Sequence, residues 1–304
     1  MEFDLHRRVD LLAAGYSTDE VRRFCRGGAL SVVRRGVYVK GALPEQPEQR
    51  HRVRVRAALE HLSSDTVISH VSAAIEHGLP VWAVPLDKVH ATRPRRQTGV
   101  RIGREVHMHS APLGAGDIVI RDGIPVTSIE RTVADLARSV PFARAVVIAD
   151  AAARGPTFAA SIADVLRDQA RWPGICGARR VVAFADRRSE SVGESRSRVA
   201  IAEAGLPAPE LQWQFTVAGR VIGRVDFAWP RHATVGEFDG RIKYGRVLRP
   251  GEDPGDTVFE EKRREDALRA MGLTVVRWTW QDLDDFAAVA TRLRRHLGHR
   301  AHPG

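Results

Sequence analysis

The chain has 304 residues, enough for two domains of ordinary size, and 43% of them are hydrophobic, which excludes an intrinsically disordered chain. Lysine and arginine together number 47 against 37 acids, and the resulting net charge of +10 favours a nucleic-acid backbone as the partner. No apolar run approaches the roughly 18 residues of a membrane helix, and the acidic start MEFDLHRRVD differs from a signal peptide. We therefore expect a cytoplasmic protein without a membrane partner. The two cysteines, Cys25 and Cys176, are too far apart in sequence to suggest a disulfide framework or a cysteine zinc site.

The first segment of the chain is predicted to form a winged helix-turn-helix. Apolar periodicity predicts a helix over residues 3–13, and Ser17 with Glu20 forms a capping box for a second helix over 18–26. Two β-branched runs within 30–39 flank a tight turn and predict a hairpin. In this layout the second helix enters the major groove and the hairpin contacts phosphates. The arginines expected to bind DNA are Arg22, Arg23, Arg26, Arg34 and Arg35. The alternative is a small α/β cap whose arginines are only solvated.

The same segment resembles the N-terminal domain of AbiEi-type antitoxins and transcriptional regulators. The resemblance rests on Ala14-Gly15-Tyr16-Ser17, Gly28-Ala29-Leu30 and Arg34-Arg35-Gly36-Val37-Tyr38-Val39. It continues through Ile68-Ser69-His70-Val71-Ser72-Ala73-Ala74, His77-Gly78-Leu79-Pro80, Gly123-Ile124-Pro125-Val126-Thr127-Ser128 and Arg131-Thr132-Val133-Ala134-Asp135-Leu136-Ala137. The resemblance implies a DNA-binding regulator, with a toxin or another protein as a partner.

The middle of the chain is predicted to be a mixed α/β linking region without a catalytic constellation. It begins with a basic helix that carries Arg50, Arg52, Arg54 and Arg56. Strands are expected over 89–92 and 106–109 around an arginine-rich turn, and helices over 129–153 and 157–186. His107 and His109 share one strand face and are candidate metal ligands. Because no carboxylate or cysteine lies at ligand spacing beside them, solvated strand histidines are the favoured interpretation.

The last third of the chain has the pattern helix–strand–strand–strand–helix–strand–helix. These elements are expected to be a helix that begins after Ser191, strands over 211–217, 220–229 and 234–240, a helix over 258–271, a strand over 273–278 and a helix over 282–297.

Acids lie inside the second and third of these strands, where burial is costly unless they are paired or bind a metal. Glu237 and Asp239 project from one strand face, and a hairpin that turns near residues 230–232 sets Asp226 beside them. Converging carboxylates suit Mg²⁺, and a nearby lysine would complete a site for phosphodiester hydrolysis.

This region resembles the PD-(D/E)XK nuclease superfamily, and within it the Vsr-like branch. The matching residues are Glu194, Val225-Asp226-Phe227, Glu237-Phe238-Asp239-Gly240, Lys243-Tyr244, Glu261-Lys262-Arg263-Arg264-Glu265 and Val276-Arg277-Trp278. The resemblance implies that Glu194, Asp226 and Glu237 bind Mg²⁺ or Mn²⁺. Asp239 occupies the position of the usual catalytic lysine and is itself a candidate ligand. Lys243 and Lys262 are the candidate replacements, and Lys262 is favoured.

The expected architecture is therefore α/β, with a winged helix-turn-helix over 1–45, a mixed linking region over 46–182 and a restriction-endonuclease-like domain over 183–304. The leading hypothesis is a DNA-binding protein with a Mg²⁺-dependent endonuclease-like domain. The alternative is an antitoxin-type regulator whose nuclease-like domain is inactive, with Asp239 in an ion pair with Arg241 or Arg277. A third hypothesis, RNA cleavage, differs only in the substrate.

Overall fold

The computed structural model describes residues 3–95, 99–156, 158–217, 220–240, 268 and 270–298. The chain is a mixed α/β protein that divides into two compact units, Met1–Phe184 and Ala185–Gly304, called the N-terminal and C-terminal units below. The expected segments 1–45 and 46–182 both lie in the N-terminal unit. Within the described residues, no helix is both long and apolar enough to cross a membrane.

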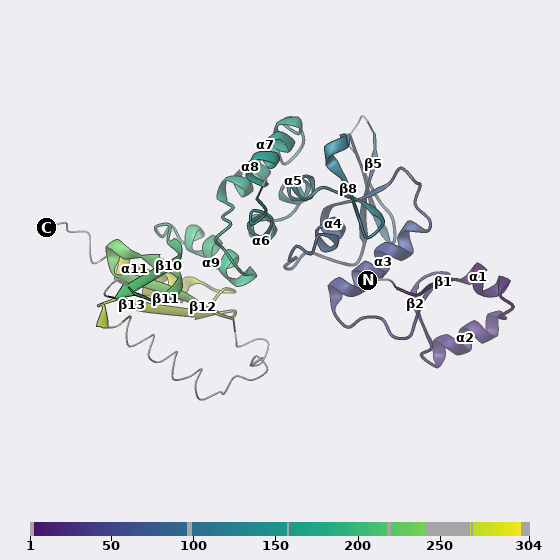
Figure 1. Cartoon of the computed structure of the whole chain (residues 1–304), viewed down its shortest axis with the longest axis horizontal. Helices are drawn as coiled ribbons and strands as arrows, with labels where there is room; N and C mark the ends of the chain where they lie inside the picture. The colour runs from purple at the N-terminus through teal and green to yellow at the C-terminus, as the bar shows by residue number, and fades with distance from the viewer. Residues whose placement is uncertain are drawn as a thin grey trace. The chain divides into compact units, whose positions relative to one another are not determined.

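The N-terminal unit begins with a small three-stranded sheet and two helices (Figure 1). Its elements are β1 (Leu5–Arg7), α1 (Arg8–Ala13), α2 (Thr18–Arg26), β2 (Leu30–Arg34) and β3 (Val37–Lys40), with strand order β1-β3-β2. Helix α2 has the predicted bounds and the predicted capping box, in which Ser17 Oγ accepts from the Glu20 N–H at 3.2 Å. The helix expected over 3–13 is wrong in its first part, because residues 5–7 pair with β3 as a strand.

The rest of the N-terminal unit surrounds a six-stranded sheet with the order β6-β7-β5-β4-β9-β8. Its strands are β4 (Val67–Ile68), β5 (Val89–Pro94), β6 (Gly99–Ile102), β7 (Val106–Ala111), β8 (Ile118–Arg121) and β9 (Ile124–Thr127). Both strands expected around the arginine-rich turn are present, but β5 and β7 pair in parallel because β6 lies between them in sequence and pairs antiparallel with β7. This parallel register places His90 of β5 beside His107 and His109 of β7.

Helices cover this sheet and extend from it. They are α3 (Pro47–Leu59), α4 (His70–Glu76), α5 (Ile129–Ser139), α6 (Phe142–Ala152), α7 (Phe158–Asp168) and α8 (Ile175–Phe184). The helix expected over 129–153 is two helices, because Pro141 precedes α6 as its N-cap. The segment 157–186 likewise divides into α7 and α8. Gly174 lies between them with φ of +80°, and a Cβ there would overlap the Arg138 carbonyl oxygen.

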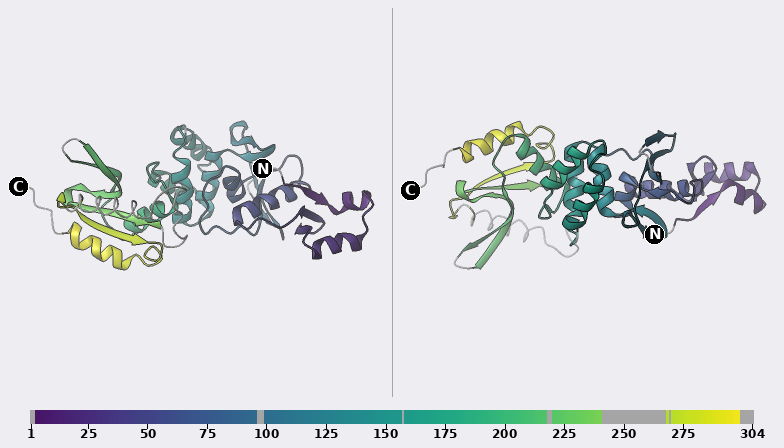
Figure 2. Two further views of the ribbon diagram at one scale, coloured as in Figure 1. Left: turned by 60° about the horizontal axis from the view of Figure 1, so that its bottom comes forward. Right: turned by 90° about the horizontal axis from the view of Figure 1, so that it is seen from above.

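The C-terminal unit has a four-stranded sheet with order β10-β11-β12-β13, in which only β12 and β13 pair in parallel. Its described elements are α9 (Val192–Glu203), β10 (Glu210–Val217), β11 (Arg220–Trp229), β12 (Thr234–Asp239), β13 (Thr274–Thr279) and α11 (Ala287–Leu297). Helix α11, yellow in Figure 2, runs along one face of this sheet, where Leu293 packs in a core with Phe227 and Trp278.

The elements of the C-terminal unit lie within a few residues of their predicted positions, apart from two differences. The final helix begins at Ala287 instead of 282, because residues 280–284 form a turn after β13, held by the hydrogen bond from the Thr279 N–H to Asp282 Oδ2 at 2.7 Å. The helix expected over 258–271 lies almost entirely outside the described residues.

Candidate functional site

The arginines of α2 are presented to solvent. Arg22, Arg23 and Arg26 are all exposed, and Val21 is the residue by which the helix is anchored in the core. Arg22 makes an ion pair with Asp19 at 3.1 Å, but both side chains remain largely exposed. A cation in such a pair exchanges partners at little cost. The exposed face of α2 is therefore available to a polyanion.

The two arginines of the β2–β3 hairpin differ from each other. Arg35 is exposed. Arg34 is half-buried, and its Nη2 lies 2.8 Å from Oε2 of Glu105, the residue before β7. Their adjacency in sequence predicts one role for both, but the structure gives Arg34 a carboxylate partner inside the protein.

Glu194 lies in the first turn of α9, and hydrogen bonds fix its carboxylate. Its Oε2 accepts from the Glu190 N–H at 2.8 Å and from Gln212 Nε2 at 2.7 Å, and Oε1 accepts from Ser191 Oγ at 2.7 Å. The glutamate is 9% exposed. Burial first, and then the Asp226 carboxylate, raise the pKa of Glu194 above its usual value, against the hydrogen bonds that lower it. Glu194 and Asp226 are therefore close enough to repel each other.

Asp226 and Glu237 occupy neighbouring strands, as the predicted hairpin requires. Asp226 Oδ2 accepts from the backbone N–H of Phe238 on β12 at 2.9 Å, which places Asp226 beside Glu237. Glu237 is 7% exposed, and its Oε2 lies 2.9 Å from Arg277 Nε on β13. Glu194, Asp226 and Glu237 thus come from α9, β11 and β12 to one region of the C-terminal unit.

The other predicted residues of this site are Asp239 and the two candidate lysines. Asp239 is half-buried at the end of β12. Arg277 makes an ion pair with Glu237 at 2.9 Å, and this contact leaves open the pairing of Asp239 with Arg241 or Arg277 that the inactive-site hypothesis expects. Lys243, Lys262 and Arg241 lie outside the described residues.

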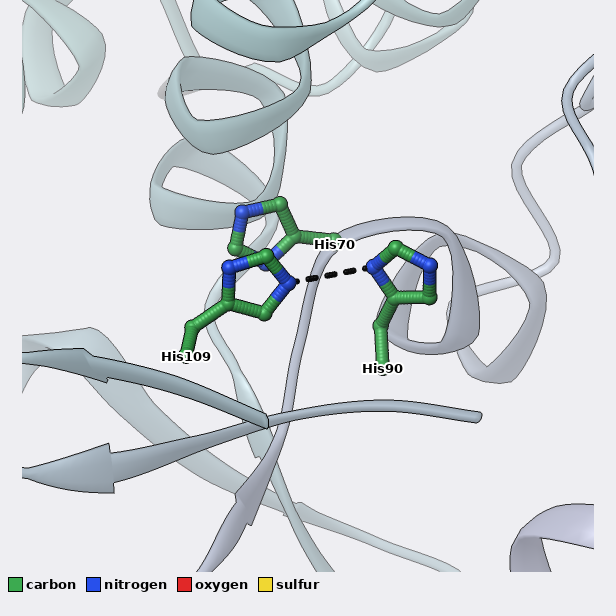
Figure 3. Close-up of side chains that lie close together, drawn as sticks. All are labelled: His70, His90 and His109. Atoms are coloured by element: carbon green, nitrogen blue, oxygen red, sulfur yellow. Dashed lines mark hydrogen bonds between the residues drawn. The ribbon is translucent and has the colours of Figure 1, made fainter. Parts of the chain in front are cut away.

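A second cluster, in the N-terminal unit, contains four histidines from three elements: His70 at the start of α4, His90 on β5, and His107 and His109 on β7. His90 Nδ1 lies 3.1 Å from His109 Nε2, the contact drawn in Figure 3. The ring of His70 stacks on that of His109 with centroids 3.7 Å apart, and the ring of His107 also stacks on that of His109, at 4.3 Å. The ligand nitrogens of His70, His90 and His109 all lie within 4.8 Å of one another.

Among the described residues, this is the one group of three metal-ligating side chains that is so closely spaced. The carboxylate oxygens of Glu194, Asp226 and Glu237 therefore do not all lie within 4.8 Å of one another. The favoured sequence interpretation of His107 and His109 as solvated histidines is wrong, because both are half-buried and pack against other imidazoles. The alternating spacing of these two residues was the available signal. Nothing in the sequence indicated that His70 and His90 would join them.

The histidines of this cluster are held in the neutral form. Burial, reinforced by the neighbouring imidazoles, lowers the pKa of His90 to about 4 and that of His109 to about 2. Burial also lowers the pKa of His70 well below its usual value. The backbone of His70 has φ of +50°, in the left-handed region, which costs a non-glycine residue about 1–2 kcal/mol. The fold thus orients the His70 ring at the expense of local strain.

A cavity of about 530 Å³ adjoins the cluster. Its lining includes His70, His109, Arg131, Arg138 and Trp172. Arg131 is 2% exposed and donates through Nε to Asp135 Oδ2 at 2.9 Å, while its guanidinium lies 4.9 Å from the centre of the Trp172 ring. Its Nη2 is buried and has no hydrogen-bond partner among the described residues. Arg131 and Arg138 both pair with Asp135, which also lines the cavity, so its wall carries both signs of charge.

Comparison with known proteins identifies relatives of part of the chain. No protein-family model matches the sequence. Two proteins of Mycobacterium tuberculosis are similar over 168 residues with 34% identity: the uncharacterized protein MT2308 of strain CDC 1551 / Oshkosh and the uncharacterized protein Rv2248 of strain ATCC 25618 / H37Rv. Each match covers 55% of this chain and 59% of the relative, so the chain spans about three-fifths of the length of these curated relatives.

The crystal structure of RV2827C protein from Mycobacterium tuberculosis superposes with a TM-score of 0.40 and 17% identity. This superposition covers 59% of this chain and 71% of that protein.

Proposed function

We propose that the protein binds DNA through its first 45 residues, as a winged helix-turn-helix, and that its C-terminal unit is a Mg²⁺-dependent endonuclease-like domain. The single observation that supports the nuclease assignment most strongly is the 2.9 Å hydrogen bond from the Phe238 N–H to Asp226 Oδ2, which sets Asp226 beside Glu237 on the neighbouring strand. The sequence resemblances to AbiEi-type regulators and to PD-(D/E)XK nucleases lead to the same proposal.

The type of donor in this region fits a hard divalent cation. Carboxylate oxygens are the ligands that Mg²⁺ prefers, and the mutual repulsion of Glu194 and Asp226 is relieved when a cation lies between them. Glu194, Asp226 and Glu237 are the residues that would hold the ion, which would supply an activated water and stabilise negative charge on the phosphate. The Ser191, Gln212 and Phe238 hydrogen bonds hold Glu194 and Asp226 in fixed orientations.

The arrangement of the first 45 residues supports DNA as the substrate class. Three antiparallel strands in the order β1-β3-β2 carry α1 and α2, and α2 presents three arginines on its exposed face. Placed in a major groove, such a helix gives cationic contacts to phosphates on both sides. Binding by α2 would bring the C-terminal unit to DNA as part of the same chain.

The proposal is tested by incubating supercoiled and linear duplex DNA with the full chain and Mg²⁺ or Mn²⁺, with chelator as the blank. We expect the wild type to cleave and Glu194→Gln to lose cleavage. Glu203→Gln is the matched control, since Glu203 is an exposed residue of the same helix. Equal cleavage by Glu194→Gln and the wild type would refute the metal site. Incubation with single-stranded RNA under the same conditions tests the third hypothesis, RNA cleavage.

A second candidate function is a DNA-binding regulator of the antitoxin type with an inactive nuclease-like domain. It is favoured by one observation, the 2.9 Å ion pair that Arg277 makes with Glu237, because a resident cation on that carboxylate competes with a metal ion. Sequence-specific DNA binding without cleavage in either metal, by a chain that is folded, would support this candidate over the endonuclease.

A further inference from the structure

The proposed DNA binding and cleavage leave the histidine cluster of the N-terminal unit without a role. We propose that His70, His90 and His109 bind a transition-metal ion of the Zn²⁺ class at the edge of the cavity that His70 and His109 line. This site is independent of the carboxylates of the C-terminal unit, because every residue in it belongs to the N-terminal unit.

The spacing of two of the nitrogens is already close to that of a metal site. Two imidazole nitrogens bound to one tetrahedral Zn²⁺ at about 2.0–2.1 Å stand about 3.3–3.4 Å apart. His90 Nδ1 and His109 Nε2 are 3.1 Å apart, on adjacent parallel strands whose register sets Thr92 opposite His109 (Figure 3). The third nitrogen, from His70, lies within 4.8 Å of both, so closure needs a side-chain movement on the order of 1 Å.

The local structure around His70 is that of an oriented ligand. His70 Nδ1 is within 3.0 Å of Ser69 Oγ, which also accepts from Thr92 Oγ1 at 2.8 Å. Figure 3 shows the Nδ1 edge of the His70 ring, rather than Nε2, toward His90 and His109. Nδ1 would therefore be the ligand atom, and the metal ion would replace Ser69 Oγ as its partner. The left-handed backbone at His70 positions the same ring.

The protonation state of the cluster is the one that a metal requires. At 3.1 Å the facing nitrogens of His90 and His109 cannot both carry a proton, so at least one presents a lone pair. The lowered pKa values of His70, His90 and His109 agree with neutral rings near pH 7. Three neutral imidazoles bind Zn²⁺ and its transition-metal neighbours, whereas Mg²⁺ prefers oxygen ligands.

The cavity beside the cluster indicates an open site. Three protein ligands leave a fourth position of a tetrahedral ion for water or another ligand, which is the pattern of catalytic rather than closed structural zinc sites. Because His70 and His109 line the cavity of about 530 Å³, an ion held by them borders a space large enough for a small molecule.

The test is a titration of untagged, metal-free full-length protein with Zn²⁺, followed by calorimetry, in the presence of excess Mg²⁺. We expect one equivalent of Zn²⁺ to bind to the wild type. His109→Asn and His90→Asn should each weaken it by at least about tenfold, since each removes one of three ligands. His61→Asn, an exposed histidine outside the cluster, is the matched control and should bind as the wild type does.

Two measurements keep this test decisive. Melting curves in chelator show whether each variant folds, and Co²⁺ added to the wild type reports the ligand set directly through the intensity of its visible absorption. An intense tetrahedral-type Co²⁺ spectrum supports the histidine site even if a variant does not fold. No saturable binding at one equivalent, or a His109→Asn protein that folds and binds Zn²⁺ as tightly as the wild type, would overturn the proposal.

Failure here is distinguishable from failure of the nuclease assignment. Asp226→Asn should leave Zn²⁺ binding unchanged, because Asp226 lies in the other unit.

Discussion

In the N-terminal unit four histidines pack ring against ring, whereas in the C-terminal unit Glu194, Asp226 and Glu237 each accept hydrogen bonds from the protein. A buried histidine can give up its proton and remain as a neutral ring, so the fold needs no counter-charge for it. A buried carboxylate near neutral pH keeps its charge only if donors or cations surround it. The two clusters therefore bury titratable groups by different means.

This difference predicts different metal chemistry in the two units. The histidine cluster offers neutral nitrogens to a borderline-soft ion, and the carboxylate cluster offers charged oxygens to a hard one. Substitution of a residue in one cluster should therefore leave metal binding by the other cluster unchanged. The predictions below test this separation.

The largest effect is expected on cleavage of DNA. Asp226→Asn removes the charge of a proposed Mg²⁺ ligand but keeps the size of the side chain and an oxygen to accept from the Phe238 N–H. We expect the cleavage rate to fall by at least about 100-fold, or about 2.7 kcal/mol in activation free energy, with the fold intact. Plasmid nicking measures the rate, and His109→Asn is the comparison variant that should still cleave. Loss of cleavage in both variants would contradict the independence of the two clusters.

The next effect is on the pH dependence of stability in chelator. The pKa of His109 in the folded chain is about 2 and that of His90 about 4, both below the unfolded value of about 6.5. At a pH between the folded and unfolded pKa values, these histidines bind protons in the unfolded chain but not in the folded chain. Stability is therefore complete above about pH 6.5 and decreases as the pH falls. Lowering the pH to about 5 should cost about 2 kcal/mol for each such histidine.

Urea unfolding of the wild type and of His109→Asn at about pH 7.5 and pH 5 measures this decrease. The stability of the variant should fall by about 2 kcal/mol less than that of the wild type over this interval, whereas His61→Asn should follow the wild type. The same decrease in the wild type and in His109→Asn would show that His109 titrates in the folded protein as it does in water.

A smaller effect is expected on DNA affinity from the arginines of α2. Replacing Arg22, Arg23 and Arg26 with Gln should lower the slope of log K against log salt by about 0.9 for each phosphate that is no longer neutralised, and weaken binding by about tenfold or more. Arg34→Gln should change the slope little, because Arg34 already pairs with Glu105. Fluorescence anisotropy at several salt concentrations measures the slope, with the exposed Arg167 of α7 as the substituted control.

Elements defined by local sequence were predicted well. The capping box at Ser17 and Glu20 gave α2 its bounds, and the turn near residues 230–232 placed Asp226 and Glu237 on neighbouring strands. In both cases the determining contacts join residues a few positions apart. Local patterning therefore sufficed for these helices and strands and for most of the carboxylate cluster.

Features that depend on distant pairing were missed. His70 and His90 reach His109 only because β5 and β7 pair in parallel and because the backbone of His70 adopts a left-handed conformation. The pairing of Arg34 with Glu105 likewise joins a hairpin to a strand far along the chain. Periodicity in a single sequence carries no information on such contacts, so it indicates His107 and His109 as candidate ligands but not the two histidines that join them.

The smallest effect concerns Arg277, whose pair with Glu237 distinguishes a metal ligand from a structural carboxylate. The Arg277 side chain is 35% exposed but that of Glu237 only 10%, so Arg277→Gln removes a cation from a mostly buried carboxylate and should lower the stability in chelator. If Glu237 is a Mg²⁺ ligand, removal of the competing cation should strengthen Mg²⁺ binding severalfold and increase the rise in melting temperature on adding Mg²⁺. If Glu237 is only the partner of Arg277, the variant should melt lower and Mg²⁺ should not restore it. Thermal melts of Arg277→Gln and wild type with and without Mg²⁺ separate these outcomes. Zn²⁺ binding at the histidine cluster should be the same in both proteins, because Arg277 and the histidines lie in different units.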